Sequence, residues 1–233
     1  MTTTPESAHH ASLDGSDALP TIDKPLLRGW FHLGAAPLVL IAGMVLMVFA
    51  PTLAGRVSSA IFTLTAVMLF GTSAVYHRGN WSPKARAVLR RMDHANIFLI
   101  IAGTYTPLCV ILLDRDTAIV ALSVVWTGAV LGLLSRILFL NAPRWLYVPM
   151  YVALGWVAIG YIGPFLASGG PAVVALIGAG GLCYTVGAVF YGFKWPGPSA
   201  RYFGFHEIFH SLTVAGFACH YIAAAIAIFR SGS

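Results

Sequence analysis

This chain of 233 residues is 58% apolar and only 9% charged, and its mean hydropathy is +0.80. Soluble globular domains carry far more charge, so the composition excludes that class and indicates a polytopic membrane protein. The formal net charge of +6 accompanies no recognisable nucleic-acid-binding motif, so we expect no nucleic-acid partner. We interpret the charge as a result of membrane topology, supplemented by attraction to anionic lipid.

The first element in chain order is a polar segment, residues 1–28, which lacks the basic start and apolar core of a secretory signal. We predict a disordered cytoplasmic tail there. Seven apolar segments of roughly 20 residues follow, and a helix of this length spans a bilayer core of about 30 Å. They lie near residues 29–51, 57–77, 93–113, 117–140, 145–167, 171–192 and 206–228. The sequence therefore predicts an all-α protein in which residues 29–233 form one domain, a bundle of seven transmembrane helices.

The distribution of basic residues predicts the orientation of this bundle, because short cytoplasmic loops carry an excess of Lys and Arg. With the N-terminus in the cytoplasm, most of the 14 basic residues fall on the cytoplasmic side. The exceptions are Arg56, Arg115 and Arg230. An odd number of crossings then places the C-terminus outside. We therefore expect an integral, multi-pass membrane protein.

Five polar residues fall near the cytoplasmic ends of three predicted helices: Ser73, His77, Asp93, His206 and His210. Ionisable side chains at membrane depth are costly, so their convergence indicates a functional site. Residues four positions apart share a helix face, as do Ser73 and His77 and the two C-terminal histidines. Three neutral imidazoles and a water form a tetrahedral zinc site, and Asp93 can bond the water or a ring N–H. The alternative is a set of interfacial histidines that bond only to lipid headgroups.

The same residues lie in short motifs that follow one another along the chain. They are Ser73-Ala-Val-Tyr-His77, Asp93-His-Ala-Asn-Ile-Phe, Gly103-Thr-Tyr-Thr-Pro107 and His206-Glu-Ile-Phe-His210. In this order they resemble the haemolysin III branch of the progestin and adipoQ receptor (PAQR) family, from about residue 29 onward. The resemblance implies a zinc ion held by three histidines that match His77, His206 and His210. It also implies an aspartate matching Asp93 and a serine matching Ser73 around a water on the zinc.

Zinc lowers the pKa of a coordinated water toward about 7 and polarises a carbonyl oxygen, which suits hydrolysis of an amide or ester. A site at membrane depth meets lipids, and relatives of the fold resemble ceramidases. We therefore expect a zinc-dependent lipid hydrolase involved in membrane lipid homeostasis in a bacterial plasma membrane. In this hypothesis Asp93 orients or deprotonates the water, and Ser73 supports Asp93 or the developing oxyanion.

The sequence leaves three other functions open. His206-Glu207-Ile-Phe-His210 also satisfies H-E-x-x-H, in which Glu207 would be the base of a metalloprotease. A lipid sensor or receptor could instead use a structural zinc closed by a fourth protein ligand. A pore, as the haemolysin name suggests, is disfavoured because few polar groups outside the cluster could line a conduit. If Glu207 is not a catalytic base, we predict an exposed acid in the first turn of a helix, where its charge suits the helix dipole.

Three further histidines receive structural interpretations. For His94 we expect a contact with lipid headgroups. His32 lies near the cytoplasmic end of the first span, where we favour an interfacial position over the alternative, a place beside the metal ligands. His220 lies about 15 Å beyond His210 along the last helix, too far for metal binding. We expect it to form a hydrogen bond with another helix or with water in a cavity.

Overall fold

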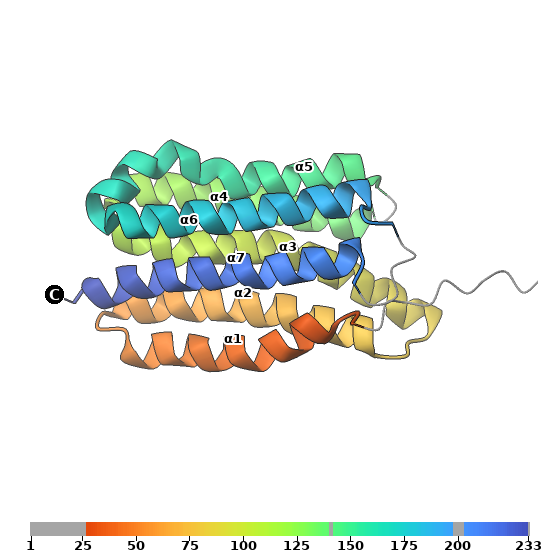
Figure 1. The fold of residues 1–233 in the computed structure, drawn as a ribbon. Helices are drawn as coiled ribbons and strands as arrows, with labels where there is room; N and C mark the ends of the chain where they lie inside the picture. The colour runs from red at the N-terminus through yellow and green to blue at the C-terminus, as the bar shows by residue number, and fades with distance from the viewer. Residues whose placement is uncertain (1–26, 140–141, 198–202, 233) are drawn as a thin grey trace, which may run out of the picture.

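The computed structural model describes residues 27–139, 142–197 and 203–232, and every regular element in these ranges is helical. Most of the polar tail predicted over residues 1–28 lies outside the described residues. The helices pack side by side into one elongated bundle (Figure 1). They are α1 (Trp30–Phe49), α2 (Leu53–Arg78), α3 (Pro83–Leu112), α4 (Arg115–Leu138), α5 (Arg144–Gly155), the 3₁₀ helix η1 (Trp156–Tyr161), α6 (Ile162–Phe193) and α7 (Phe205–Arg230).

Six helical segments of the described chain are long and apolar enough to cross a membrane. Large apolar side chains also cover the outer surface of the bundle; Leu38 is 67% exposed and Leu53 is 77% exposed. Water would penalise such a surface, whereas lipid tails solvate it. These features confirm an integral, multi-pass membrane protein.

The predicted fifth and sixth spans lie in one stretch, Arg144–Phe193, whose 50 residues include α5, η1 and α6. Such a length greatly exceeds one bilayer crossing. The stretch is interrupted at Gly170, where φ is 78° and ψ is 175°, a conformation that glycine adopts without a steric penalty. The chain reverses its direction within this stretch (Figure 1), and Arg144 Nη1 donates to the Tyr191 carbonyl oxygen at 2.8 Å. The two ends of the stretch therefore lie side by side.

The start of α3 differs from the sequence prediction. The helix begins at Pro83, ten residues before the predicted start of the span at residue 93. Ser82 caps it by accepting a hydrogen bond from the Ala85 N–H at 3.3 Å, and proline suits the first helical position. The predicted start was placed where the apolar residues begin. The basic turns before that point are helical too, and they project beyond the neighbouring helices (Figure 1). Asp93 therefore lies about three turns inside α3.

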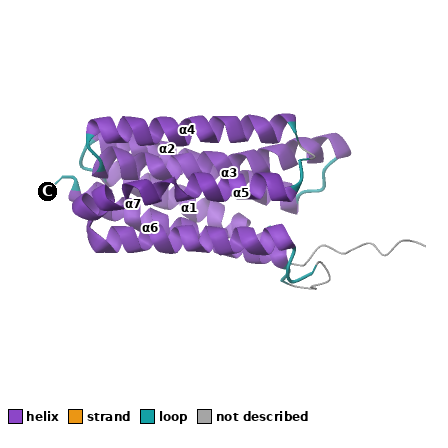
Figure 2. Cartoon of the chain, turned by 90° about the horizontal axis from the view of Figure 1, so that it is seen from above, coloured by secondary structure: helices purple, strands orange, loops and turns teal. Residues whose placement is uncertain are grey.

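Small residues allow the helices to approach closely at the centre of the bundle, where α3 is the most buried of the long helices (Figure 2). A Cβ added to Gly103 would lie 1.9 Å from Thr65 Oγ1 of α2. Likewise, a Cβ added to Gly43 of α1 would lie 2.2 Å from Thr63 Oγ1. Packing of this kind is the main attraction between helices in lipid. It holds α1, α2 and α3 in the arrangement that positions the polar cluster.

Candidate metal centre

Three histidines from two helices meet at one end of the bundle. His77 lies in the last turn of α2, while His206 and His210 lie one turn apart at the start of α7. One potential ligand atom from each lies within 4.8 Å of the others. The ring centroid of His77 is 4.7 Å from that of His206 and 5.0 Å from that of His210. This group could hold a metal ion.

The spacing of the donor atoms fits a tetrahedral metal. Zinc–nitrogen bonds of about 2.0–2.1 Å at a tetrahedral angle place two nitrogens roughly 3.3 Å apart. His77 Nε2 and His206 Nε2 are 3.1 Å apart, close to that value. The His210 nitrogen lies within 4.8 Å of the other two, so small side-chain rotations would bring it to the same metal ion. Three imidazoles are a donor set that suits zinc, copper, iron and nickel.

Asp93 and Ser73 lie beside the histidines. Asp93 Oδ2 is 3.7 Å from His77 Nε2, and the residue is 7% exposed. Ser73, one turn before His77 on α2, is 1% exposed. Its hydroxyl lies close enough to interact with the Asp93 carboxyl, although no partner satisfies Ser73 Oγ with full hydrogen-bond geometry in the described chain. The fold thus brings the five residues of the predicted site together, while their chemical roles stay a prediction.

His32 belongs to this cluster, as the alternative to an interfacial position had it. The residue is 2% exposed. Its ring stacks on His210 with centroids 3.9 Å apart and planes only 2° from parallel, and it meets Phe70 edge-on at 4.9 Å. Both ring nitrogens lack a hydrogen-bond partner in the described chain. The available signal was depth: His32 lies near the same end of its span as the three histidines.

The headgroup contact predicted for His94 was also wrong. His94 Nδ1 lies 3.1 Å from Arg136 Nη2, and the His94 carbonyl oxygen accepts a hydrogen bond from Tyr151 Oη at 3.1 Å. Arg136 is 2% exposed, and its guanidinium lies 4.0 Å from the ring centroid of Tyr147. His94 therefore joins α3 to α4 and α5 inside the protein.

Glu207 is buried, contrary to the exposed position expected for it. It is 1% exposed, and its Oε1 forms an ion pair with Arg28 Nε. Its Oε2 accepts a hydrogen bond from the Gly204 N–H at 2.9 Å. Both carboxylate oxygens are thus engaged in holding the start of α7 and the chain before α1. This arrangement weighs against Glu207 as the base of a metalloprotease.

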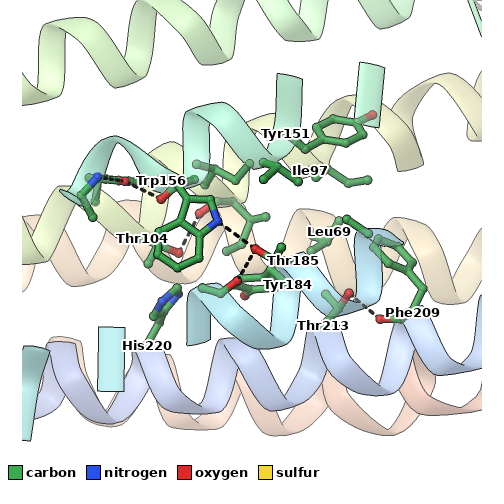
Figure 3. A pocket seen from close by; sticks show the side chains of 18 of the residues that line it. Leu69, Ile97, Thr104, Tyr151, Trp156, Tyr184, Thr185, Phe209, Thr213 and His220 are labelled. Carbon is green, nitrogen blue, oxygen red and sulfur yellow. Dashed lines mark hydrogen bonds between the residues drawn. The ribbon is translucent and has the colours of Figure 1, made fainter. Parts of the chain in front are cut away.

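A cavity of about 190 Å³ extends from the metal-site residues into the bundle. Asp93, His206 and His210 line one end, and His220 lines a region about ten residues further along α7. Most of the wall between is apolar, with Leu69, Ile97 and Phe209 among its side chains (Figure 3). The cavity can accommodate an apolar chain whose polar end lies at the histidines.

The wall of this cavity includes η1. Tyr105 Oη donates to the Gly155 carbonyl oxygen at 2.7 Å and accepts from the Ala158 N–H at 2.6 Å. Trp156 Nε1 donates to Thr185 Oγ1 at 2.8 Å (Figure 3). Tyr105 thus satisfies two backbone groups where the α-helical hydrogen-bond pattern is interrupted, and the Trp156–Thr185 bond joins η1 to α6. The prediction for His220 is confirmed, since its Nε2 lies 3.1 Å from the Ile177 carbonyl oxygen of α6.

Comparison with known proteins shows the family of this chain. The profile of a family described as Haemolysin-III related matches residues 21–221. The protein named Hemolysin-3 homolog of Bacillus subtilis (strain 168) is 32% identical over 162 residues, which cover 70% of this chain and 73% of that protein. Hemolysin-3 of Bacillus cereus is 29% identical over 189 residues, which cover 79% of this chain and 83% of that protein. The matched region includes all five clustered residues, and the chain belongs to the Haemolysin-III related family.

Proposed function

We propose that this protein is a zinc-dependent hydrolase that cleaves an amide or ester bond of a membrane lipid and so serves membrane lipid homeostasis. One observation carries the proposal: a three-histidine group, an aspartate and a serine lie together at the end of a largely apolar cavity. An apolar substrate chain fits the cavity, and its polar end then lies at the residues that can perform hydrolysis.

The metal would be held by His77, His206 and His210, whose donor spacing fits zinc. Bound zinc supplies a water of lowered pKa and polarises the scissile carbonyl. Asp93 takes the proton of the attacking water as its oxygen bonds to the carbonyl carbon, and then gives that proton to the leaving nitrogen or oxygen. The hydroxyl of Ser73 donates a hydrogen bond to the developing oxyanion or to Asp93. The products are a fatty acid and an amine or alcohol.

The proposal includes seven crossings with the N-terminus in the cytoplasm. The reversal within Arg144–Phe193 supports two crossings there. Arg28, Arg136 and Arg144 lie at the same end of the bundle as the histidines, as their contacts with Glu207, His94 and Tyr191 require. Because basic residues gather on the cytoplasmic side, this supports a site near the cytoplasmic face.

A lipid sensor with a structural zinc is the second candidate. It is favoured by the position of Asp93, whose Oδ2 is 3.7 Å from His77 Nε2. A small shift would let this carboxylate become a fourth ligand, and four protein ligands are typical of structural zinc. In that function the cavity binds a lipid without turnover.

Elemental analysis of the detergent-solubilised protein, purified without added metal, tests the metal centre. We expect near-stoichiometric zinc in the wild type, little in His206→Ala/His210→Ala, and an unchanged content in the control His220→Gln. A folded wild type without metal would refute both the hydrolase and the zinc-containing sensor.

A screen of lipid amides and esters then separates the two candidates. Hydrolysis by the wild type that is lost in Asp93→Ala, with zinc content retained, would support the enzyme. Stoichiometric zinc without turnover of any lipid in the screen would favour the sensor.

A further inference from the structure

The inner part of the cavity contains several hydroxyl groups that are already satisfied. Thr104 Oγ1 donates to the Ile100 carbonyl oxygen at 2.8 Å, and Thr213 Oγ1 donates to that of Phe209 at 2.8 Å. Thr185 Oγ1 likewise donates within its own helix and also accepts from Trp156 (Figure 3). Such bonds to the preceding turn are the usual way for a threonine to be satisfied inside a membrane helix. These threonine hydroxyls therefore need no hydrogen bond from a ligand.

Tyr184 and His220 are different. Both line the same cavity, and their ring centroids are 5.5 Å apart (Figure 3). Tyr184 Oη and His220 Nδ1 are buried atoms that have no hydrogen-bond partner in the described chain. Two unsatisfied polar atoms on adjacent side chains are uncommon in a protein interior, and burial without a partner costs free energy.

The hydrogen-bond capacity of this pair follows from its surroundings. His220 Nε2 lies 3.1 Å from the Ile177 carbonyl oxygen, which can only accept, so Nε2 carries the hydrogen. In the neutral ring Nδ1 is then an acceptor. Tyr184 Oη, on a ring whose centroid is 5.5 Å from that of His220, offers a donor hydrogen. A ligand hydroxyl complements both atoms, because it can donate to His220 Nδ1 and accept from Tyr184 Oη.

We propose that Tyr184 and His220 form a hydroxyl-binding subsite that recognises a hydroxylated hydrocarbon chain of the lipid substrate. The assignment of the chain to a substrate rests on the proposed function. His220 lies ten residues beyond His210 on α7, about 15 Å along the helix. An extended chain advances about 1.2 Å per bond, so the hydroxyl lies roughly 12 bonds from the carbonyl held at the metal centre.

The subsite makes the cavity selective. An unsubstituted chain leaves Tyr184 Oη and His220 Nδ1 without ligand partners, whereas a chain with a hydroxyl at the right depth satisfies both. Sites built to bond a ligand hydroxyl discriminate against analogues that lack it, because buried polar groups are then left unpaired. A hydroxyl beside the carboxyl group cannot reach this depth, so position as well as presence of the hydroxyl matters.

Binding of three free fatty acids tests the subsite without requiring turnover. The probes are octadecanoic acid and its derivatives hydroxylated at carbon 12 or at carbon 2, titrated into the detergent-solubilised, metal-loaded protein by calorimetry. We expect the mid-chain derivative to bind about tenfold more tightly than the other two, as about two additional hydrogen bonds allow. Equal affinities would overturn the proposal and would indicate that a bound water satisfies the pair.

Two conservative variants identify the residues responsible. Tyr184→Phe removes only the hydroxyl, and His220→Gln keeps a donor near the Nε2 position for Ile177 while removing the Nδ1 acceptor. Each is expected to reduce the tenfold preference to about twofold or less. Tyr221→Phe is the matched control, since Tyr221 Oη donates to Ala42 O and Tyr221 is not among the lining side chains. A preference that survives in both subsite variants, with the fold verified by circular dichroism, would refute the assignment.

The outcomes also separate this inference from the proposed function. If the wild type prefers the mid-chain derivative but hydrolyses no lipid amide or ester, the subsite stands and the hydrolase fails. If the wild type contains zinc and hydrolyses lipids without regard to a chain hydroxyl, the hydrolase stands and the subsite fails.

Discussion

Replacing Arg28 by alanine is expected to destabilise the fold, because Glu207 would keep a buried charge without its partner. Glu207 is 1% exposed and pairs with Arg28 through Oε1. Removing one partner of a buried ion pair costs about 3–5 kcal/mol. Two features reduce that figure: the Arg28 side chain is 22% exposed, so water can approach, and the Gly204 N–H still donates to Oε2. We therefore expect a loss of about 2–3 kcal/mol in the free energy of unfolding.

The measurement is an SDS titration of the protein in detergent micelles, followed by circular dichroism, for Arg28→Ala, Glu207→Gln and the double variant. A neutral glutamine needs no counter-charge, so Arg28→Ala should cost less than about 1 kcal/mol in the Glu207→Gln background. Arg56→Ala is the control, because Arg56 Nε donates to the Ala50 carbonyl oxygen. The reasoning fails if Arg28→Ala costs the same in both backgrounds, or less than about 0.5 kcal/mol alone.

Three further predictions concern the metal centre and the packing around it. Asp93→Asn should retain zinc by elemental analysis but lower lipid hydrolysis about 10²–10⁴-fold, whereas Glu207→Gln should leave hydrolysis within about threefold; the reverse order would favour a metalloprotease. His32→Ala removes the ring that stacks on His210 and should lower zinc affinity about tenfold in a chelator competition, whereas His32→Phe keeps a stacked ring and should retain the affinity. Equal zinc affinities in both variants and the wild type would show that the stacking does not support the metal centre. Gly103→Ala should cost about 1–3 kcal/mol in the SDS titration, because its Cβ would lie 1.9 Å from a threonine hydroxyl of α2. Gly71→Ala, with no atom near the new Cβ, should cost less than about 0.5 kcal/mol, and a similar loss in both would contradict the packing argument.

The apolar segments were predictable because hydropathy and length alone decide whether a helix can cross a bilayer. The same reasoning fixed depth along each helix, and depth placed His77, Asp93 and His210 at one level before any contact was known. The prediction from hydropathy failed where a helix extends beyond its apolar segment. The basic residues from Lys84 onward suit water, yet Pro83 with its Ser82 cap starts the helix there, so Asp93 lies well inside α3.

The sequence did not predict how each helix is rotated about its own axis, and so which side chains face one another. The depth of His32 was correct, but only the packing of α1 against α2 and α7 turns its ring onto His210. Glu207 occupies a first turn, which favours an acid in any setting, but the Arg28 partner before α1 is 179 positions away in the chain.

The sequence by itself thus determined which segments enter the membrane, the family to which the chain belongs and the level at which its polar residues gather. The tertiary structure decided which of these residues touch, and it formed the cavity that joins the histidines to Tyr184 and His220. The physical reason is that transfer of apolar residues into lipid is a property of each segment alone. Contacts between helices depend instead on how small residues such as Gly43 and Gly103 let the segments pack, which is a property of the whole bundle.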